Sequence, residues 1–196
     1  MLEFSARTNL RLKVTHRQME IIVGCLLGDG YIHPRGQIQI EQSVKQLPYI
    51  NWKHDELCSI AYGLPTKVER FDNRYGKKYV GARFWLRQYF RPLRKIFYPE
   101  GRKIFPMKMS KYFTNLSLAV WYMDDGNLYK GRHVKIACDG FDSKTRKLLQ
   151  SLLLNKYGLK STVHKSGKLR ISAESLSEFF RLVKPYVHSS MMYKVP

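Results

Sequence analysis

The chain has 196 residues, and 44% of them are hydrophobic, which is enough for a buried core and excludes a wholly disordered protein. Lysine and arginine exceed aspartate and glutamate by 20 formal charges, with +9 in residues 1–98 and +11 in residues 99–196. An excess spread over the whole chain is typical of a protein that holds a long polyanion along an extended surface, so we expect a nucleic acid partner.

Cysteine usage and apolar runs exclude several further classes. The three cysteines are far apart and show no CxxC or Cys/His spacing, so they predict neither a zinc module nor a disulfide framework, and they fit a reducing compartment. No apolar run approaches the length of a membrane span, and no secretory signal is visible. Residues 1–14 are predicted to form a basic N-terminal arm, for which a transit segment, a DNA-contacting arm and plain disorder are open interpretations.

Two pairs of similar segments indicate an internal repeat. The apolar runs at 22–30 and 118–126 both end in Asp-Gly and lie 96 positions apart. The segments 62–68 and 157–163 both begin Tyr-Gly-Leu and lie 95 positions apart. Two matched pairs at nearly one spacing predict two copies of one unit, which we place at 15–104 and 105–196.

In the first copy, Thr15 followed by Gln18 predicts the capping box of a helix, and Gly30 predicts its end. A short loop at 33–36 precedes residues whose alternation of polar and apolar side chains is typical of a strand. The predicted elements after this loop are a strand at 37–42, a helix at 49–62, a hairpin of 66–71 with 78–85, and a closing helix at 86–97.

The second copy repeats this order of elements. Thr114 or Asn115 is expected to cap its first helix and Gly126 to end it, and a loop is predicted at 127–131. The elements that follow are a strand at 133–137, a helix at 143–157, a hairpin of 161–164 with 168–172, and a helix at 175–183. The sequence therefore predicts an α/β (α+β) fold of two pseudo-symmetric αββαββα halves, each with a small antiparallel sheet covered by helices.

The two Asp-Gly pairs break a local rule at matching places. Asp29 and Asp125 lie at the C-terminal ends of apolar helices, where a carboxylate faces the negative end of the helix dipole at a cost of about 0.3–1 kcal/mol. If the two helices pack side by side, as the small residues Gly24 and Gly28 favour, the carboxylates converge into an oxygen site suited to a divalent cation. In so basic a chain, this points to metal-dependent phosphodiester hydrolysis, although each Asp-Gly is also a common turn dipeptide.

These segments resemble the paired motifs of the single-chain LAGLIDADG homing endonucleases. The segment WYMDDG at 121–126 and the stretch 182–196 are similar to the omega-type meganuclease branch. The first segment keeps the final Asp-Gly but departs from the motif at Ile22, Val23, Cys25 and Gly28. The resemblance implies motif helices packed at the centre and Mg²⁺-dependent cutting of both strands of a long double-stranded DNA target, with 3′ overhangs, by a monomer.

The resemblance also implies roles for individual acidic residues and carbonyl groups. Asp29 and Asp125 would be the catalytic, metal-binding acids, one for each strand. The carbonyls of Gly28 and Asp124 would be further candidate metal ligands.

Four more residues receive roles from the same resemblance. Lys103 and Lys194 would be the basic catalytic residue of each half close to the cleaved phosphate, with ordinary surface charge as the alternative. Glu41 matches a position where the family has a polar residue at or beside the metal ligands, and Asp139 is its loose counterpart in the second copy.

The polar face of the predicted strands suggests how DNA would be recognised. Arginine, lysine and glutamine side chains on a β-ribbon fit the major groove and can address the edges of guanine and adenine. A solvated outer sheet face is the alternative. The candidate DNA-binding residues are Gln37, Gln39, Arg70, Arg83, Lys135, Lys168 and Arg170.

Two other functions remain open from the sequence. One is an RNA maturase that assists intron splicing, with intron RNA as partner, and the other is a DNA-binding protein of the same fold that does not cut. We expect an intracellular protein, either of an organelle (mitochondrion or chloroplast) or of a bacterial or phage-infected cytoplasm.

Overall fold

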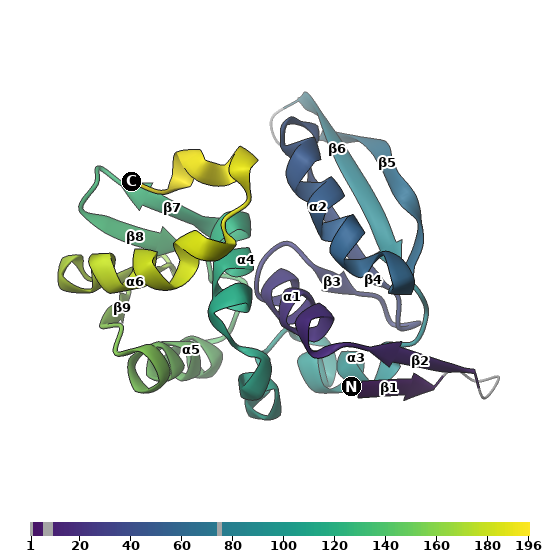
Figure 1. Cartoon of the computed structure of the whole chain (residues 1–196), viewed down its shortest axis with the longest axis horizontal. Helices are drawn as coiled ribbons and strands as arrows, with labels where there is room; N and C mark the ends of the chain where they lie inside the picture. Colours follow the sequence, from purple (N-terminus) through teal and green to yellow (C-terminus); the bar gives the residue numbers. More distant parts are fainter. Residues whose placement is uncertain (1, 6–9, 74–75) are drawn as a thin grey trace.

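The computed structural model describes residues 2–5, 10–73 and 76–196, and it consists of two halves around a central helix pair (Figure 1). Helices α1 (His16–Leu27) and α4 (Asn115–Asp125) lie side by side at this centre. Both begin with the capping box of a threonine, so the box predicted at Thr15 and Gln18 is confirmed, and Thr114 caps the second helix.

The two central helices approach closely because glycine lines their contact. A Cβ atom at Gly24 would lie 2.6 Å from Cβ of Val120, and one at Gly28 would lie 2.6 Å from Cβ of Asp124. Any larger residue at these positions would push the helices apart. The predicted close packing of the two motif helices is therefore confirmed.

Each half contains one four-stranded antiparallel sheet with the same strand order. In the first half the order is β3-β4-β6-β5, and in the second it is β7-β8-β10-β9. The strands of the first sheet are β3 (Tyr31–Ile32), β4 (Ile38–Ser43), β5 (Ala61–Asp72) and β6 (Lys77–Leu86). Those of the second are β7 (Gly126–Tyr129), β8 (His133–Ile136), β9 (Ser161–Val163) and β10 (Leu169–Ile171). The repeated order confirms the predicted mixed fold with antiparallel sheets.

The remaining helices pack around these sheets. Helix α2 lies against β4, β5 and β6, and α6 packs on α4. Their bounds are α2 (Leu47–Leu57), α3 (Arg91–Phe97), α5 (Ser143–Tyr157) and α6 (Leu176–Val183), with short 3₁₀ turns η3 (Pro99–Gly101), η4 (Met107–Tyr112) and η7 (Ser189–Lys194) among the connections. None of the helices that the structure describes is long and apolar enough to cross a membrane.

Several predicted boundaries were wrong, each for a local reason. Strand β5 begins at Ala61, so the predicted helix at 49–62 ends at Leu57. The predicted helix at 86–97 begins only at Arg91, because Leu86 still pairs with Ile38 in the sheet. The predicted loop at 127–131 is largely strand β7, and the turn that follows has positive φ angles at Lys130 and Gly131.

The N-terminal arm folds onto the first half. Strands β1 (Leu2–Ser5) and β2 (Arg11–Val14) pair antiparallel, and Phe4 packs its ring 5.0 Å from that of Phe90. Plain disorder is therefore wrong for residues 2–5 and 10–14, whereas residues 1 and 6–9 lie outside the described part of the chain.

Candidate active site

The two acids of the repeated motif lie at matching ends of the central helices. Asp125 is the last residue of α4, and Asp29 follows the residue Gly28 that caps α1. The Asp125 carbonyl accepts a hydrogen bond from Ala137 N at 3.1 Å, which ties the helix end to the residue that directly follows strand β8. The side-by-side packing of α1 and α4 thus brings the two carboxylates to one region, as predicted.

Both carboxylates have a strongly perturbed acidity. Asp29 is open to solvent on the wall of a cavity, but protein atoms around it and repulsion from Asp124 raise its pKa to about 6. Burial, followed by repulsion from Asp29 and Asp124, raises the pKa of Asp125 to about 7. Asp29 and Asp125, which repel each other and are both repelled by Asp124, thus lie at the ends of two helices where a cation would stabilise them.

The predicted lysines cap the two central helices. Lys103 Nζ donates to the carbonyls of Gly28 and Gly30, at 3.1 Å each, and Lys194 Nζ donates to the Met123 carbonyl at 2.5 Å. Burial lowers the pKa of Lys103 to about 8, and burial also lowers that of Lys194. Both ammonium groups therefore lie where helix carbonyls and carboxylates concentrate negative charge.

Lys103 lies beside the acid of the other half. A cavity of about 260 Å³ is lined by Lys103 and Asp125 together with Gly28 and Asp139. Among the carboxylates that act on Lys103, Asp125 has the largest electrostatic effect and Asp29 the second. The sequence had assigned this lysine to the first half alone, whereas its surroundings join it to the second acid.

Glu41 and Asp139, the two predicted polar neighbours, line the cavities but are not the residues that contact the acids. Glu41 shares a cavity of about 390 Å³ with Asp29, yet the amide that donates to Asp29 Oδ2, at 2.8 Å, belongs to Gln42. Successive side chains of a strand point to opposite faces, so Glu41 faces outward and Gln42 faces the central helices. Gln42 is thus the residue of this strand that contacts Asp29, and a role of Glu41 beside the metal stays a prediction.

Three further residues of the site were missed from the sequence. Lys53 Nζ lies 2.6 Å from Asp124 Oδ1, and both side chains are completely buried. Tyr49 donates its hydroxyl to the same oxygen at 2.9 Å, and Gln42 donates its amide to it at 3.1 Å. Asp124, proposed only for its carbonyl, thus carries a buried charge on its side chain. In the sequence, a lysine four residues after Tyr49 on a predicted helix gives no sign of such a pairing.

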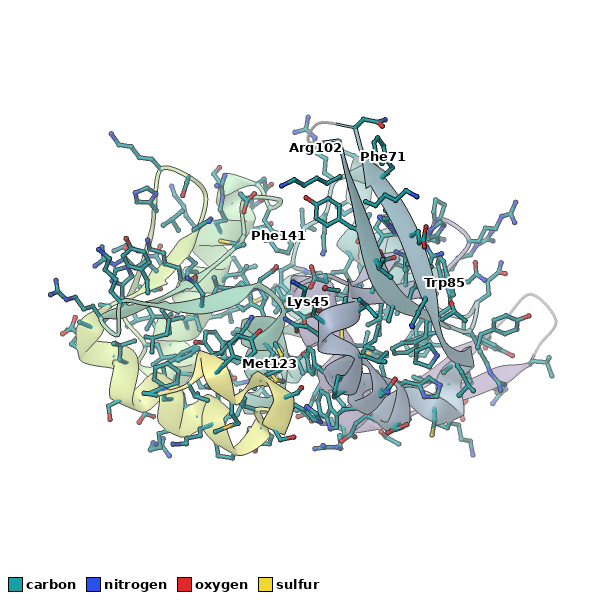
Figure 2. All side chains as sticks on the ribbon, turned by 90° about the horizontal axis from the view of Figure 1, so that it is seen from above. Lys45, Phe71, Trp85, Arg102, Met123 and Phe141 are labelled. Carbon is teal, nitrogen blue, oxygen red and sulfur yellow. The ribbon has the colours of Figure 1, made fainter. Side chains whose placement is uncertain are left out.

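The candidate DNA-binding residues of the first half lie on one sheet surface. Arg70 donates to Glu41 Oε2 at 2.7 Å, Gln39 donates to it at 3.0 Å, and Arg83 lies 3.7 Å from it. Gln37 directly precedes β4 and lies two residues before Gln39, so the alternation of side chains places both on the same face. Figure 2 shows the long hairpin of β5 and β6, and Trp85, which it labels, lies beside Arg83 on this surface. Glu41 therefore gathers the cationic side chains of this surface.

The second half offers a smaller version of the same surface. Lys135 of β8 lies directly opposite Arg170 of β10, and its ammonium group is 3.8 Å from the ring centre of Tyr129. Lys168 lies two residues before Arg170 and, like it, is exposed. Each sheet thus carries the predicted basic residues on an accessible face, while their contact with DNA stays a prediction.

Comparison with known proteins agrees with this architecture. The profile described as the LAGLIDADG DNA endonuclease family matches residues 19–179. The chain belongs to this family.

The proteins similar to this LAGLIDADG chain include mRNA maturases and a homing endonuclease of known structure. It is 28% identical to the cytochrome b mRNA maturase bI2 of Debaryomyces hansenii, over 95% of this chain and 76% of that protein. It is 30% identical to the protein of the same name from Saccharomyces cerevisiae, over 90% of this chain but only 47% of that protein. The solved structure of the homing endonuclease I-WcaI bound to its DNA recognition sequence matches with a TM-score of 0.83 and 25% identity, over 94% of this chain and 88% of the other.

The donor atoms at the LAGLIDADG helix ends fit a hard divalent cation. Within residues 2–5, 10–73 and 76–196, no three acidic, histidine or cysteine side chains form a complete ligand set. Asp29 and Asp125 would therefore act with carbonyl, water or phosphate oxygens, which is how Mg²⁺ is commonly bound. The Gly28 carbonyl already accepts from Lys103, so only its second lone pair is available.

We expect the two carboxylates to destabilise the cation-free protein as the pH rises. Their pKa values lie above the ordinary value of 3.8, so the protonated forms favour the fold, and this stability is lost as the pH rises from about 4 to about 7. Asp125→Asn should therefore raise the melting temperature by several degrees at pH 7.5 and have little effect at about pH 4, given about 2–4 °C per kcal/mol for this size. Thermal melts in chelator, with Asp55→Asn as the exposed control, measure the difference. An equal effect of Asp125→Asn at both pH values would contradict the assignment.

Proposed function

We propose that the chain is a site-specific homing endonuclease that cuts both strands of a long double-stranded DNA target by metal-dependent phosphodiester hydrolysis. The observation that carries the proposal is the pair of carboxylates, Asp29 and Asp125, at adjoining ends of α1 and α4, between two sheets with basic outer faces. The similarity to a homing endonuclease solved with its DNA supports the same reading.

The chain's own groups have distinct tasks in this proposal. Asp29 and Asp125 would hold Mg²⁺, which supplies Lewis acidity to the phosphodiester and to the attacking water. Lys103 and Lys194, already directed at the helix ends, would stabilise the negative charge that develops on the phosphate. The basic residues of the two sheets would contact base edges and phosphates on either side of the cut.

One chain is sufficient for both cuts in this proposal. Each half contributes one acid and one lysine, and the two halves are joined through α1 and α4. A monomer would therefore present its two centres to the two strands of one duplex.

A second candidate function is assistance in RNA splicing. Two relatives carry the name cytochrome b mRNA maturase, which favours intron RNA as a partner of this chain. Because both names refer to cytochrome b mRNA, they also favour an organelle over a bacterial or phage-infected cytoplasm among the predicted compartments. Two acids at the helix ends have no evident task in RNA folding, and we therefore place cleavage first.

Selection from a randomised duplex library tests the proposed function directly. Incubation of the protein with the library and Mg²⁺ should release fragments whose ends define one long sequence, cut in both strands. Chelator should abolish the release, because two carboxylates alone do not activate water at neutral pH. Sequence-specific retention of duplexes without any cut would support a non-cleaving DNA-binding protein, and selective binding of intron RNA with no duplex selected would support the maturase.

A further inference from the structure

A buried ion pair joins the two halves next to the candidate active site. Lys53 belongs to α2 of the first half and Asp124 to α4 of the second, and their side chains have no exposed surface. Nζ of Lys53 and Oδ1 of Asp124 are 2.6 Å apart. Burial opposes the charge of Lys53, but attraction by Asp124 raises its pKa on balance, so the lysine stays ionised. Removal of either partner alone would leave an unpaired charge in the core.

The internal repeat shows that the fold itself does not need this pair. The buried residues Tyr49, Lys53 and Leu57 of α2 correspond, 96 positions later, to buried residues of α5. The position of Lys53 is Leu149 in the second half, and the position of Asp124 is Gly28 in the first. Apolar and small residues therefore fill the same places without charge. Since a buried ion pair seldom adds stability over such packing, it calls for another role.

The hydrogen bonds of the pair lead to a catalytic candidate. Oδ1 of Asp124 accepts from Lys53, Tyr49 and Gln42. Nε2 of Gln42 also donates to Oδ2 of Asp29 at 2.8 Å, so each of its two protons meets a different carboxylate. This bridge fixes the rotation of the Gln42 amide. Without an acceptor at Asp124, the amide is free to turn its carbonyl oxygen toward Asp29 and repel it.

The second acid has no equivalent support. Cys138 takes the place of Gln42, 96 positions later, and its thiol donates to the Gly167 carbonyl at 2.9 Å. In the described part of the chain, no hydrogen bond reaches the carboxylate of Asp125. The bridge therefore acts on one of the two centres only.

We propose that Lys53 and Asp124 are positioning residues, which act through Gln42 to hold the Asp29 carboxylate in its working orientation. The inference rests on the proposed endonuclease function. It predicts an asymmetric enzyme, in which loss of the pair slows cutting of the strand that Asp29 serves and leaves the other strand unaffected.

The double variant Lys53→Leu/Asp124→Ala tests this without creating an unpaired charge. It copies Leu149 at the lysine position, and Leu149→Met is the control in the other half. Single-turnover cleavage with each strand labelled should show the Asp29 strand, identified with Asp29→Asn, slowed by about 10–100-fold, the usual effect of losing a group that orients a ligand. The other strand should stay within about twofold. Lys53→Leu/Asp124→Asn keeps an acceptor for Gln42 and should restore much of the lost rate.

A second readout needs neither cation nor DNA. The side-chain amide signals of Gln42 in an NMR spectrum, assigned by their loss in Gln42→Leu, should move toward those of a solvated amide in the double variant. Unchanged Gln42 signals, or equal slowing of both strands by a folded double variant, would overturn the proposal. Absence of any cutting by the unmodified protein would instead refute the endonuclease function, so the two failures are distinguishable.

Discussion

Asp125→Asn is expected to stop the cutting of one DNA strand, and Asp29→Asn that of the other, while binding of the duplex stays nearly unchanged. The amide keeps the size of the carboxylate but removes its negative charge. That charge would hold the cation and compensate it for the water molecules that it gives up on binding. We expect each cutting rate to fall by about 10⁴-fold, the order seen when one charged member of a catalytic unit is removed. Each variant should then accumulate nicked duplex.

The measurement is a single-turnover assay with both strands labelled, at saturating enzyme and pH 8, where both carboxylates are ionised by their pKa values of about 6 and 7. Asp55→Asn, whose side chain is exposed on α2, is the matched control for loss of one negative charge. If Asp29→Asn and Asp125→Asn cut both strands at normal rates, neither acid is catalytic. Loss of binding together with cutting would point instead to an effect on the fold.

The sequence predicted the centre of the molecule well because its signals there are local. The capping box at Thr15 depends only on two residues three positions apart. The repeat of Asp-Gly after 96 positions can be recognised from the sequence without any knowledge of the fold. Gly24 and Gly28 then indicated which helix face could approach another helix. The alternation of polar and apolar side chains within 37–42 was enough to predict a strand that has Gln39 on its polar face.

What the sequence could not supply depends on pairings between distant elements. Lys53 becomes a residue of the site only because α2 of one half meets α4 of the other, 71 positions away. Gln42 and Glu41 differ by a single register step, and only the packing of β4 against the central helices decides which of them faces Asp29. The hairpin of β1 and β2 was missed because its stability comes from apolar contacts such as Phe4 with Phe90.

Lys103→Met is expected to slow the same strand as Asp125→Asn, although Lys103 belongs to the first half in sequence. The two groups line one cavity, and Asp125 exerts the largest electrostatic effect of any carboxylate on this lysine. Methionine keeps most of the volume of the side chain and removes the ammonium group. We expect the rate on that strand to fall by about 10²–10³-fold, the range found when one charge-stabilising donor is lost.

Lys194→Met completes the test. Asp125 acts on both lysines more strongly than Asp29 does, but if each strand needs one acid and one lysine, the assignment of Lys103 to Asp125 leaves Lys194 for the strand served by Asp29. Its ammonium group caps α4 at Met123, so the variant should also weaken α4 slightly, which thermal melts would record. The two lysine and two aspartate variants should then form two pairs according to the strand that each one slows. Lys103 pairs with Asp125, and Lys194 pairs with Asp29. The opposite pairing would mean that each lysine serves the acid of its own half. Unchanged rates in both lysine variants would restrict the two lysines to capping α1 and α4 and leave the aspartates as the catalytic groups.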